Sequence, residues 1–129
     1  MTTTDSGNRV ILFGATGYTG RLTAQALVDR GQRPVLAARN EEAVRALAER
    51  LGGLDWAVAD ARDLASLTTL LDESSVLVSL VGPYTRFGDV AAQSAIATGC
   101  TYLDGTGEAG FIRRVFEDHG PRARGAMLT

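Results

Sequence analysis

Short apolar runs alternate with amphipathic segments along the whole chain. The apolar runs are four to six residues long and are bounded by glycine, proline or polar residues, which is typical of buried parallel strands. We therefore expect strands at 10–13, 34–38, 54–59, 76–81, 101–104 and 125–129. Between them, apolar positions recur at helical spacing, which predicts helices at about 18–30, 41–51, 64–71, 89–98 and 108–119.

This strict alternation of strand and helix, with short connections, predicts an α/β fold with a doubly wound parallel sheet. Right-handed crossovers favour the strand order 3-2-1-4-5-6, the Rossmann fold. Residues 10–129 suffice for a single domain of this kind, and residues 1–9 form a polar N-terminal tail. Because a sixth strand has only begun at residue 125, we expect the chain to be a fragment of a longer two-domain protein.

A glycine-rich turn joins the first expected strand to the first helix. The order strand, glycine-rich turn, helix is the structural context in which such a motif indicates dinucleotide binding. Its spacing is G-x-x-G-x-x-G. Gly14 permits a sharp turn off the strand, Gly17 permits close approach of a pyrophosphate, and Gly20 permits tight packing of the helix on the sheet. The helix N-terminus then offers free N–H groups to phosphate. The cofactor-binding residues expected here are Gly14, Thr16, Gly17, Tyr18, Thr19 and Gly20. A tight turn without ligand is the alternative.

Composition narrows the possible partners. The net charge of −2 argues against a general nucleic-acid or membrane-surface protein. No apolar run could span a bilayer, and the polar N-terminus is not a signal peptide. A single cysteine, Cys100, fits a reducing cytoplasm and a buried, non-catalytic role. One cysteine and one histidine cannot build a zinc site, so we expect no metal.

Two strand ends carry candidate residues for the adenosine half of a dinucleotide. Arg39 ends the second strand, where an arginine accommodates the 2′-phosphate of NADP; a solvated surface arginine is the alternative. Asn40 is a candidate contact as well as a helix cap. Asp60, followed by Ala61, ends the third strand. Its carboxylate could accept a hydrogen bond from the adenine amino group or simply cap a loop.

The fourth strand ends in Val81, Gly82, Pro83 and Tyr84, beside the point where dinucleotides lie in such sheets. Tyr84 is either a cofactor contact or a packing aromatic. After the fifth strand, Asp104 and Glu108 could face substrate, but a start to the next helix is the favoured role for Thr106 or Glu108. The single histidine, His119, is expected on the surface, and Phe116 on the buried face of its helix.

Four ordered motifs resemble the NADP-binding domain of saccharopine dehydrogenase-like oxidoreductases, and in particular the trans-acting enoyl reductases of mycobacteria. They are residues 14–20 (GATGYTG), 38–40 (ARN), 81–84 (VGPY) and 102–108 (YLDGTGE). The resemblance implies NADP as cofactor, a nicotinamide bordered by the 81–84 loop, and a small-molecule substrate bound mainly by a second domain that is absent here. It assigns no catalytic residue.

The chain contains no lysine, which limits the proton-transfer chemistry that it can perform alone. Short-chain dehydrogenases move a proton with a Tyr-x-x-x-Lys pair, and no such pair exists here. The sequence therefore predicts the cofactor-binding part of an NADP-dependent oxidoreductase, with hydride transfer in the full-length protein. The alternative is a non-catalytic module that senses NADP(H). The oligomeric state is left open.

Overall fold

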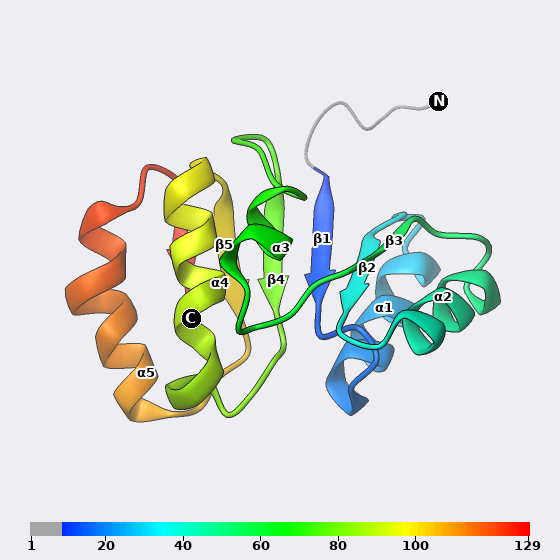
Figure 1. Cartoon of the computed structure of the whole chain (residues 1–129), viewed down its shortest axis with the longest axis horizontal. Helices are drawn as coiled ribbons and strands as arrows, with labels where there is room; N and C mark the ends of the chain where they lie inside the picture. The colour runs from blue at the N-terminus through cyan, green and yellow to red at the C-terminus, as the bar shows by residue number, and fades with distance from the viewer. Residues whose placement is uncertain (1–8) are drawn as a thin grey trace.

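The computed structural model describes residues 9–129, so the N-terminal tail expected at 1–9 lies outside the described residues except for Arg9. Six strands form one sheet (Figure 1). Their bounds are β1 Val10–Phe13, β2 Val35–Ala38, β3 Trp56–Val58, β4 Val76–Ser79, β5 Thr101–Asp104 and β6 Met127–Leu128.

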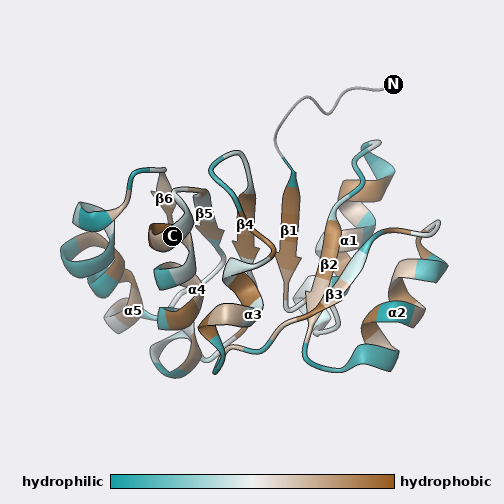
Figure 2. Ribbon diagram, turned by 45° about the horizontal axis from the view of Figure 1, so that its top comes forward, coloured by the Kyte–Doolittle hydropathy of each residue, from teal (hydrophilic) through white to brown (hydrophobic). Residues whose placement is uncertain are grey.

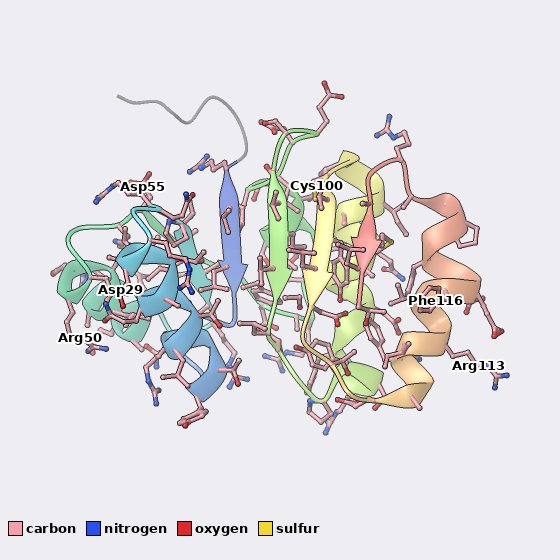
Figure 3. The ribbon with its side chains drawn as sticks, turned by 180° about the vertical axis from the view of Figure 1, so that it is seen from behind. Asp29, Arg50, Asp55, Cys100, Arg113 and Phe116 are labelled. Atoms are coloured by element: carbon pink, nitrogen blue, oxygen red, sulfur yellow. The ribbon has the colours of Figure 1, made fainter. Side chains whose placement is uncertain are left out.

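Helices connect the strands in the expected alternation. They are α1 Tyr18–Asp29, α2 Glu41–Arg50, α3 Leu64–Thr68, α4 Tyr84–Thr98 and α5 Ala109–Arg114, the last continued by a π-helical turn at Val115–His119 and a 3₁₀ turn at Gly120–Arg122. Figure 1 views the sheet from the side of α3, α4 and α5, and Figure 3 views it from the side of α1 and α2. The domain is thus a three-layer α/β/α arrangement.

The strand order is β3-β2-β1-β4-β5-β6, and every neighbouring pair is parallel. This confirms the predicted doubly wound, Rossmann-like fold. Because β1 lies between β2 and β4, the chain leaves the middle of the sheet in opposite directions on its two sides. The connections after β1 and β4 therefore separate at the carboxyl edge and leave a crevice there.

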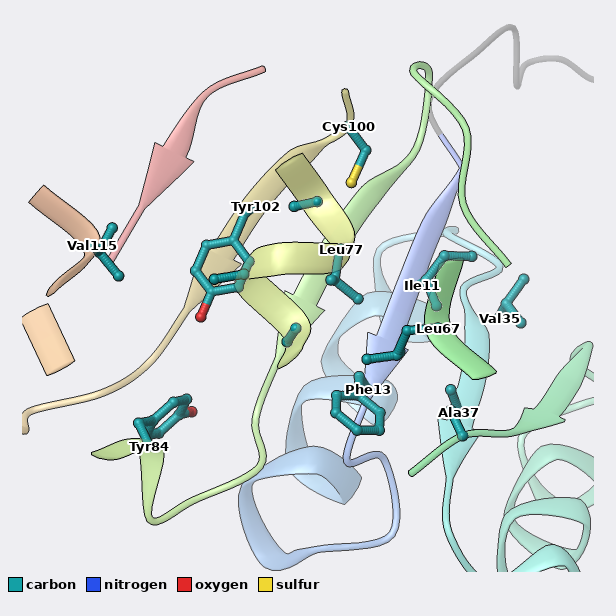
Figure 4. Packing of buried hydrophobic residues seen from close by; sticks show 14 of the residues in the cluster. Ile11, Phe13, Val35, Ala37, Leu67, Leu77, Tyr84, Cys100, Tyr102 and Val115 are labelled. Carbon is teal, nitrogen blue, oxygen red and sulfur yellow. The ribbon is translucent and has the colours of Figure 1, made fainter. Parts of the chain in front are cut away.

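Two apolar cores hold the layers together, one on each face of the sheet. Figure 2 shows the hydrophobic colour along β1, β2 and β4 in the middle of the sheet. Alternate residues of one strand serve different cores: Leu12 packs toward α1 and α2, whereas Ile11 and Phe13 pack toward α3 and α4 (Figure 4). All three side chains are essentially inaccessible to solvent. Burial of side chains of this size contributes roughly 1.5–3 kcal/mol each, which explains why the strands are apolar on both faces.

Three expectations about the helices were wrong. α4 begins at Tyr84, five residues before the expected start, because its first turn is capped from another loop. His119 is buried, with 4% of its surface exposed, rather than on the surface. Phe116 is 71% exposed rather than buried. Phe111, Val115 and His119 recur every four residues and are the buried positions of this segment, whereas Phe116 lies on the exposed face; hydropathy alone predicts the reverse for His119 and Phe116.

Candidate functional site

Gly14 makes the sharp turn at the end of β1. Its φ of +87° lies in the left-handed region that favours glycine. A Cβ at this position would lie 2.8 Å from Cγ2 of Val81, so the turn also fits closely against the end of β4. The backbone N–H groups of Gly14 and Ala15 both donate to the carbonyl of Ala37, at 2.9 and 3.2 Å, which fixes the turn beside β2.

The other two glycines of the turn, Gly17 and Gly20, differ in whether the fold leaves room for a side chain. A Cβ on Gly20 would lie 2.8 Å from backbone atoms of Ala15, so this residue permits close packing of α1 on the turn. Gly17 has an ordinary φ of −73°, and a Cβ there would meet only the carbonyl oxygen of Gly14, at 3.5 Å. The fold itself therefore does not require glycine at position 17, and the space beside it is open to a ligand.

The N-terminus of α1 faces this open space. Gly17 is its N-cap residue and provides no side-chain cap. The N–H groups of Tyr18, Thr19 and Gly20 belong to the first turn and have no carbonyl four residues earlier within the helix. Tyr18 and Thr19 are exposed. With the positive end of the helix dipole, these donors suit a phosphate.

A pocket of about 210 Å³ lies next to the turn, at the carboxyl ends of β1, β2, β3 and β4. It is lined by Phe13, Gly14, Thr16, Ala38, Arg39, Ala59, Asp60, Ala61, Arg62, Val81, Gly82 and Phe87. The structure thus brings together seven of the predicted site residues, from the four loops that follow β1, β2, β3 and β4. The volume is below the roughly 300–1,000 Å³ of drug-sized sites, so it suits one part of a dinucleotide rather than the whole.

Arg39 and Asn40 follow β2 but serve different purposes. The Asn40 side chain accepts a hydrogen bond from the N–H of Ala43 at 3.0 Å, which confirms its role as the cap of α2. Arg39 is exposed and lines the pocket. Within residues 9–129, no carboxylate lies within ion-pair distance of its guanidinium. Arg39 therefore offers at the pocket a positive charge that is not held in an ion pair among residues 9–129.

Asp60 and Arg62 form an ion pair on the wall of the pocket. The Arg62 Nε donates to one carboxylate oxygen of Asp60 at 3.1 Å, and Nη2 donates to the other at 3.0 Å. These bonds, with the Arg62 backbone N–H at 2.9 Å, lower the pKa of Asp60 to about 2. Sequence reasoning missed Arg62, although its place two residues after a strand-end carboxylate was a usable signal.

The loop after β4 and the start of α4 supply further residues of the pocket wall. Val81 and Gly82 line the pocket, and so does Phe87 from the first turns of α4, which the sequence did not single out. Pro83 is the N-cap residue of α4. Tyr84 is buried and donates its hydroxyl to the carbonyl of Ser79 at 3.0 Å, so its ring takes part in packing. Burial raises the pKa of this hydroxyl, which keeps it protonated.

The acidic side chains of the loop after β5 make hydrogen bonds within the protein. The Glu108 carboxylate accepts hydrogen bonds from the N–H groups of Tyr84 and Thr85, at 2.7 and 3.0 Å, and so caps α4. Glu108 is also the N-cap residue of α5 by position, but without a side-chain cap there. Asp104 accepts from the hydroxyls of Tyr102 and Thr129 and from the N–H of Thr106.

Residues 9–129 offer neither a metal-binding cluster nor a membrane-spanning helix. No group of three or more His, Cys, Asp or Glu side chains could hold a metal ion. Among the helices of this described region, none combines the length and apolarity needed to cross a membrane. Cys100 is buried, and burial raises the pKa of its thiol, as expected for a small core residue.

The sheet order, the glycine turn and the pocket at the switch point define a Rossmann-like domain of the type that binds nucleotide cofactors. Residues 10–126 match the family described as the saccharopine dehydrogenase NADP binding domain. The chain therefore belongs to this family, as its motifs predicted.

A curated relative is the trans-acting enoyl reductase of Mycobacterium ulcerans (strain Agy99), 40% identical over 110 residues. The match covers 81% of this chain but only 26% of that protein. The chain thus spans about a quarter of the length of this relative.

Solved structures show the same fold. Apo saccharopine dehydrogenase (L-Glu forming) from Saccharomyces cerevisiae superposes with a TM-score of 0.65 at 25% identity, covering 84% of this chain and 24% of that one. The Citrobacter sp. triphenylmethane reductase complexed with NADP(H) gives a TM-score of 0.64 at 23% identity, with coverage of 74% and 36%. At that identity, the second likeness concerns the fold alone.

Proposed function

We propose that this domain binds NADP(H) across the carboxyl edge of its sheet. The pyrophosphate would lie at the N-terminus of α1, beside Gly17, and the adenosine half would enter the pocket near Arg39 and Asp60. The 81–84 loop would border the nicotinamide half. Membership of a family of NADP-binding domains supports this assignment.

The residues present fit such a cofactor. The space that a Cβ on Gly17 would take is not used by the protein, and the N-terminus of α1 has no side-chain cap. The observation that carries the proposal is Arg39: an exposed guanidinium, without a carboxylate partner among residues 9–129, at the pocket next to the glycine turn. A planar guanidinium pairs well with the oxygens of a 2′-phosphate.

Calorimetric titration of NADP⁺ and NAD⁺ tests the assignment. A charge-assisted contact to the 2′-phosphate should favour NADP⁺ by about tenfold to a hundredfold, or about 1–3 kcal/mol. Arg39→Ala should remove most of this preference and leave NAD⁺ binding nearly unchanged. Arg45→Ala is the matched control, because Arg45 is exposed on α2 and does not line the pocket. Equal affinities in the wild type, or a preference retained in Arg39→Ala, would contradict the role of Arg39.

The full-length protein would be an oxidoreductase that reduces or oxidises a small molecule, with the substrate held mainly by a second domain. The bound cofactor would supply hydride transfer, and this domain would hold and orient it. The length of the relatives supports this proposal, since the matching region covers only 26% and 29% of two of them. A cytoplasmic location stays a prediction from the single cysteine.

A non-catalytic NADP(H) sensor is the second candidate. It is favoured by one observation: the chain has no lysine, and its buried tyrosines, Tyr84 and Tyr102, donate their hydroxyls to protein acceptors. The two candidates differ in whether the coding sequence continues into a substrate domain. Reading that sequence beyond residue 129 separates them.

A further inference from the structure

Asp60 and Arg62 form a two-point ion pair on the wall of the pocket. Two parallel N–H···O bonds join the edge of the Arg62 guanidinium to the two oxygens of the carboxylate, and the Arg62 backbone N–H adds a third bond. This fork geometry fixes the plane of the guanidinium. It does so although 68% of the Arg62 side chain is exposed.

The pairing changes what each residue can offer a ligand. Asp60 accepts three bonds from Arg62, so its carboxylate is largely committed within the protein. Arg62 is bound at its edge, which leaves the flat faces of the guanidinium uncovered by this contact. The two charges compensate each other, whereas Arg39 has no such partner among residues 9–129. Arg39 therefore suits an anion, and Arg62 suits a flat, neutral ring.

We propose that the guanidinium of Arg62 is a stacking platform for the purine base of the cofactor, and that Asp60 is a positioning residue that holds this platform in its plane. The inference rests on the proposed function. Nucleic-acid bases stack on arginine planes as well as on aromatic rings, and the cation lies over the π-face of the base. Asp60 would then act through Arg62, rather than accept a hydrogen bond from the adenine amino group.

The apolar lining of the pocket is consistent with a base. Apart from Asp60 and its two arginine neighbours, the wall is formed mainly by glycine, alanine, valine and phenylalanine. These residues can contact the faces and edges of a ring without demanding hydrogen bonds from it. Thr16 and Arg39 lie toward the turn and the end of β2, where the phosphates and the ribose would be expected.

Titration of the 129-residue chain with NADP⁺ and NAD⁺ tests the platform. Arg62→Ala should weaken both dinucleotides by the same factor, about two- to fivefold, as for an exposed cation–π contact. Arg62→Lys should lose part of the affinity, because it keeps the charge but not the flat surface on which a base stacks. Arg45→Ala serves again as the control. A loss confined to NADP⁺ would mean that Arg62 touches the 2′-phosphate, and unchanged binding of both would mean no contact; either result overturns the platform.

Two additional measurements isolate the role of Asp60. Asp60→Asn should weaken binding in the wild-type background but not in the Arg62→Ala background, since a positioning residue acts only through its partner. The hypoxanthine analogue of NADP⁺ lacks the adenine amino group and should bind nearly as tightly as NADP⁺. A strong loss with this analogue, together with an Asp60→Asn effect that persists in Arg62→Ala, would show that Asp60 contacts the base directly and would overturn the inference. Failure of the wild type to bind either dinucleotide would overturn the proposed function as well.

Discussion

The carboxylate of Glu108 accepts a hydrogen bond from the backbone N–H of Tyr84 at 2.7 Å, across 24 positions of sequence. Its other oxygen accepts from both the N–H and the hydroxyl of Thr85, each at 3.0 Å. The residue at the N-cap position of α4 is Pro83, which has no side-chain acceptor. A residue of the β5–α5 loop thus supplies the cap, and it ties this loop to the Gly82–Pro83 loop at the candidate site.

Glu108→Gln should therefore loosen the start of α4. The amide retains one acceptor oxygen but loses the negative charge that favours a helix N-terminus. We expect the melting temperature to fall by a few degrees, and Glu108→Ala to lower it further. Glu117→Gln is the matched control, because Glu117 forms only an exposed ion pair with Arg113. Equal melting temperatures for the Glu108 and Glu117 variants would show that the cap has no measurable effect.

The stabilising effect of Glu108 should depend on pH. Hydrogen bonds from the N–H groups of Thr85 and Tyr84 hold the pKa of Glu108 below its ordinary value of 4.5. A carboxylate with a depressed folded-state pKa stabilises the fold above its unfolded-state pKa, and this contribution is lost as the pH falls through the folded-state value. The difference in melting temperature between wild type and Glu108→Gln should be constant near pH 7 and shrink below about pH 4.5. A difference that grows on acidification would contradict this.

Gly17 and Gly20 should respond differently to the same substitution. Gly20→Ala places a Cβ against the backbone of Ala15 and should destabilise the fold by about 1–3 kcal/mol or more. Gly17→Ala meets no such obstacle and should leave the free energy of unfolding nearly unchanged. Gly17→Val should also fold, as judged by circular dichroism, yet lose dinucleotide affinity by more than about tenfold, or 1.4 kcal/mol. If folded Gly17→Val binds like the wild type, the phosphates lie elsewhere.

His119 and Phe116 provide a direct contrast within one π-helical turn. The Nε2 of His119 lies 2.9 Å from a carboxylate oxygen of Asp89, and its Nδ1 lies 3.2 Å from Nη2 of Arg122. His119→Ala removes a buried side chain together with its contacts to Asp89 and Arg122, which should destabilise the fold by about 1–3 kcal/mol in urea unfolding. Phe116→Ala should change it by less than about 0.5 kcal/mol, since the ring is 71% exposed. The reverse order would contradict the burial of His119 and the exposure of Phe116.

The chain alone should not turn over substrate. It has no lysine, its single histidine is buried, and it spans about a quarter of its enoyl reductase relatives. NADPH oxidation with enoyl and carbonyl substrates should stay at the rate of a control without protein. Steady turnover above that control would place a catalytic group within these 129 residues.

The sequence by itself determined the order of elements, the sheet topology and the glycine turn. Strands and helices are specified by apolar periodicity within a few residues, and right-handed crossovers leave few ways to connect them. The cap of α2 was equally predictable, because Asn40 and Ala43 are three positions apart and meet in any helix that starts there. Arg39 was predictable in the same way. It directly follows the second strand, one helix and one strand after the glycine turn.

Only the tertiary structure decided which distant groups meet. Glu108 caps α4 because β4 and β5 are neighbours, which brings the loops that follow them to the same edge of the sheet. Phe87 reaches the pocket because this cap lets α4 begin at Tyr84. His119 is buried because it follows Phe111 and Val115 at four-residue intervals and lies beside Phe111 and Asp89, and hydropathy does not predict a polar side chain at such a position. Local periodicity encodes the elements, but contacts between loops depend on where the whole sheet places their ends.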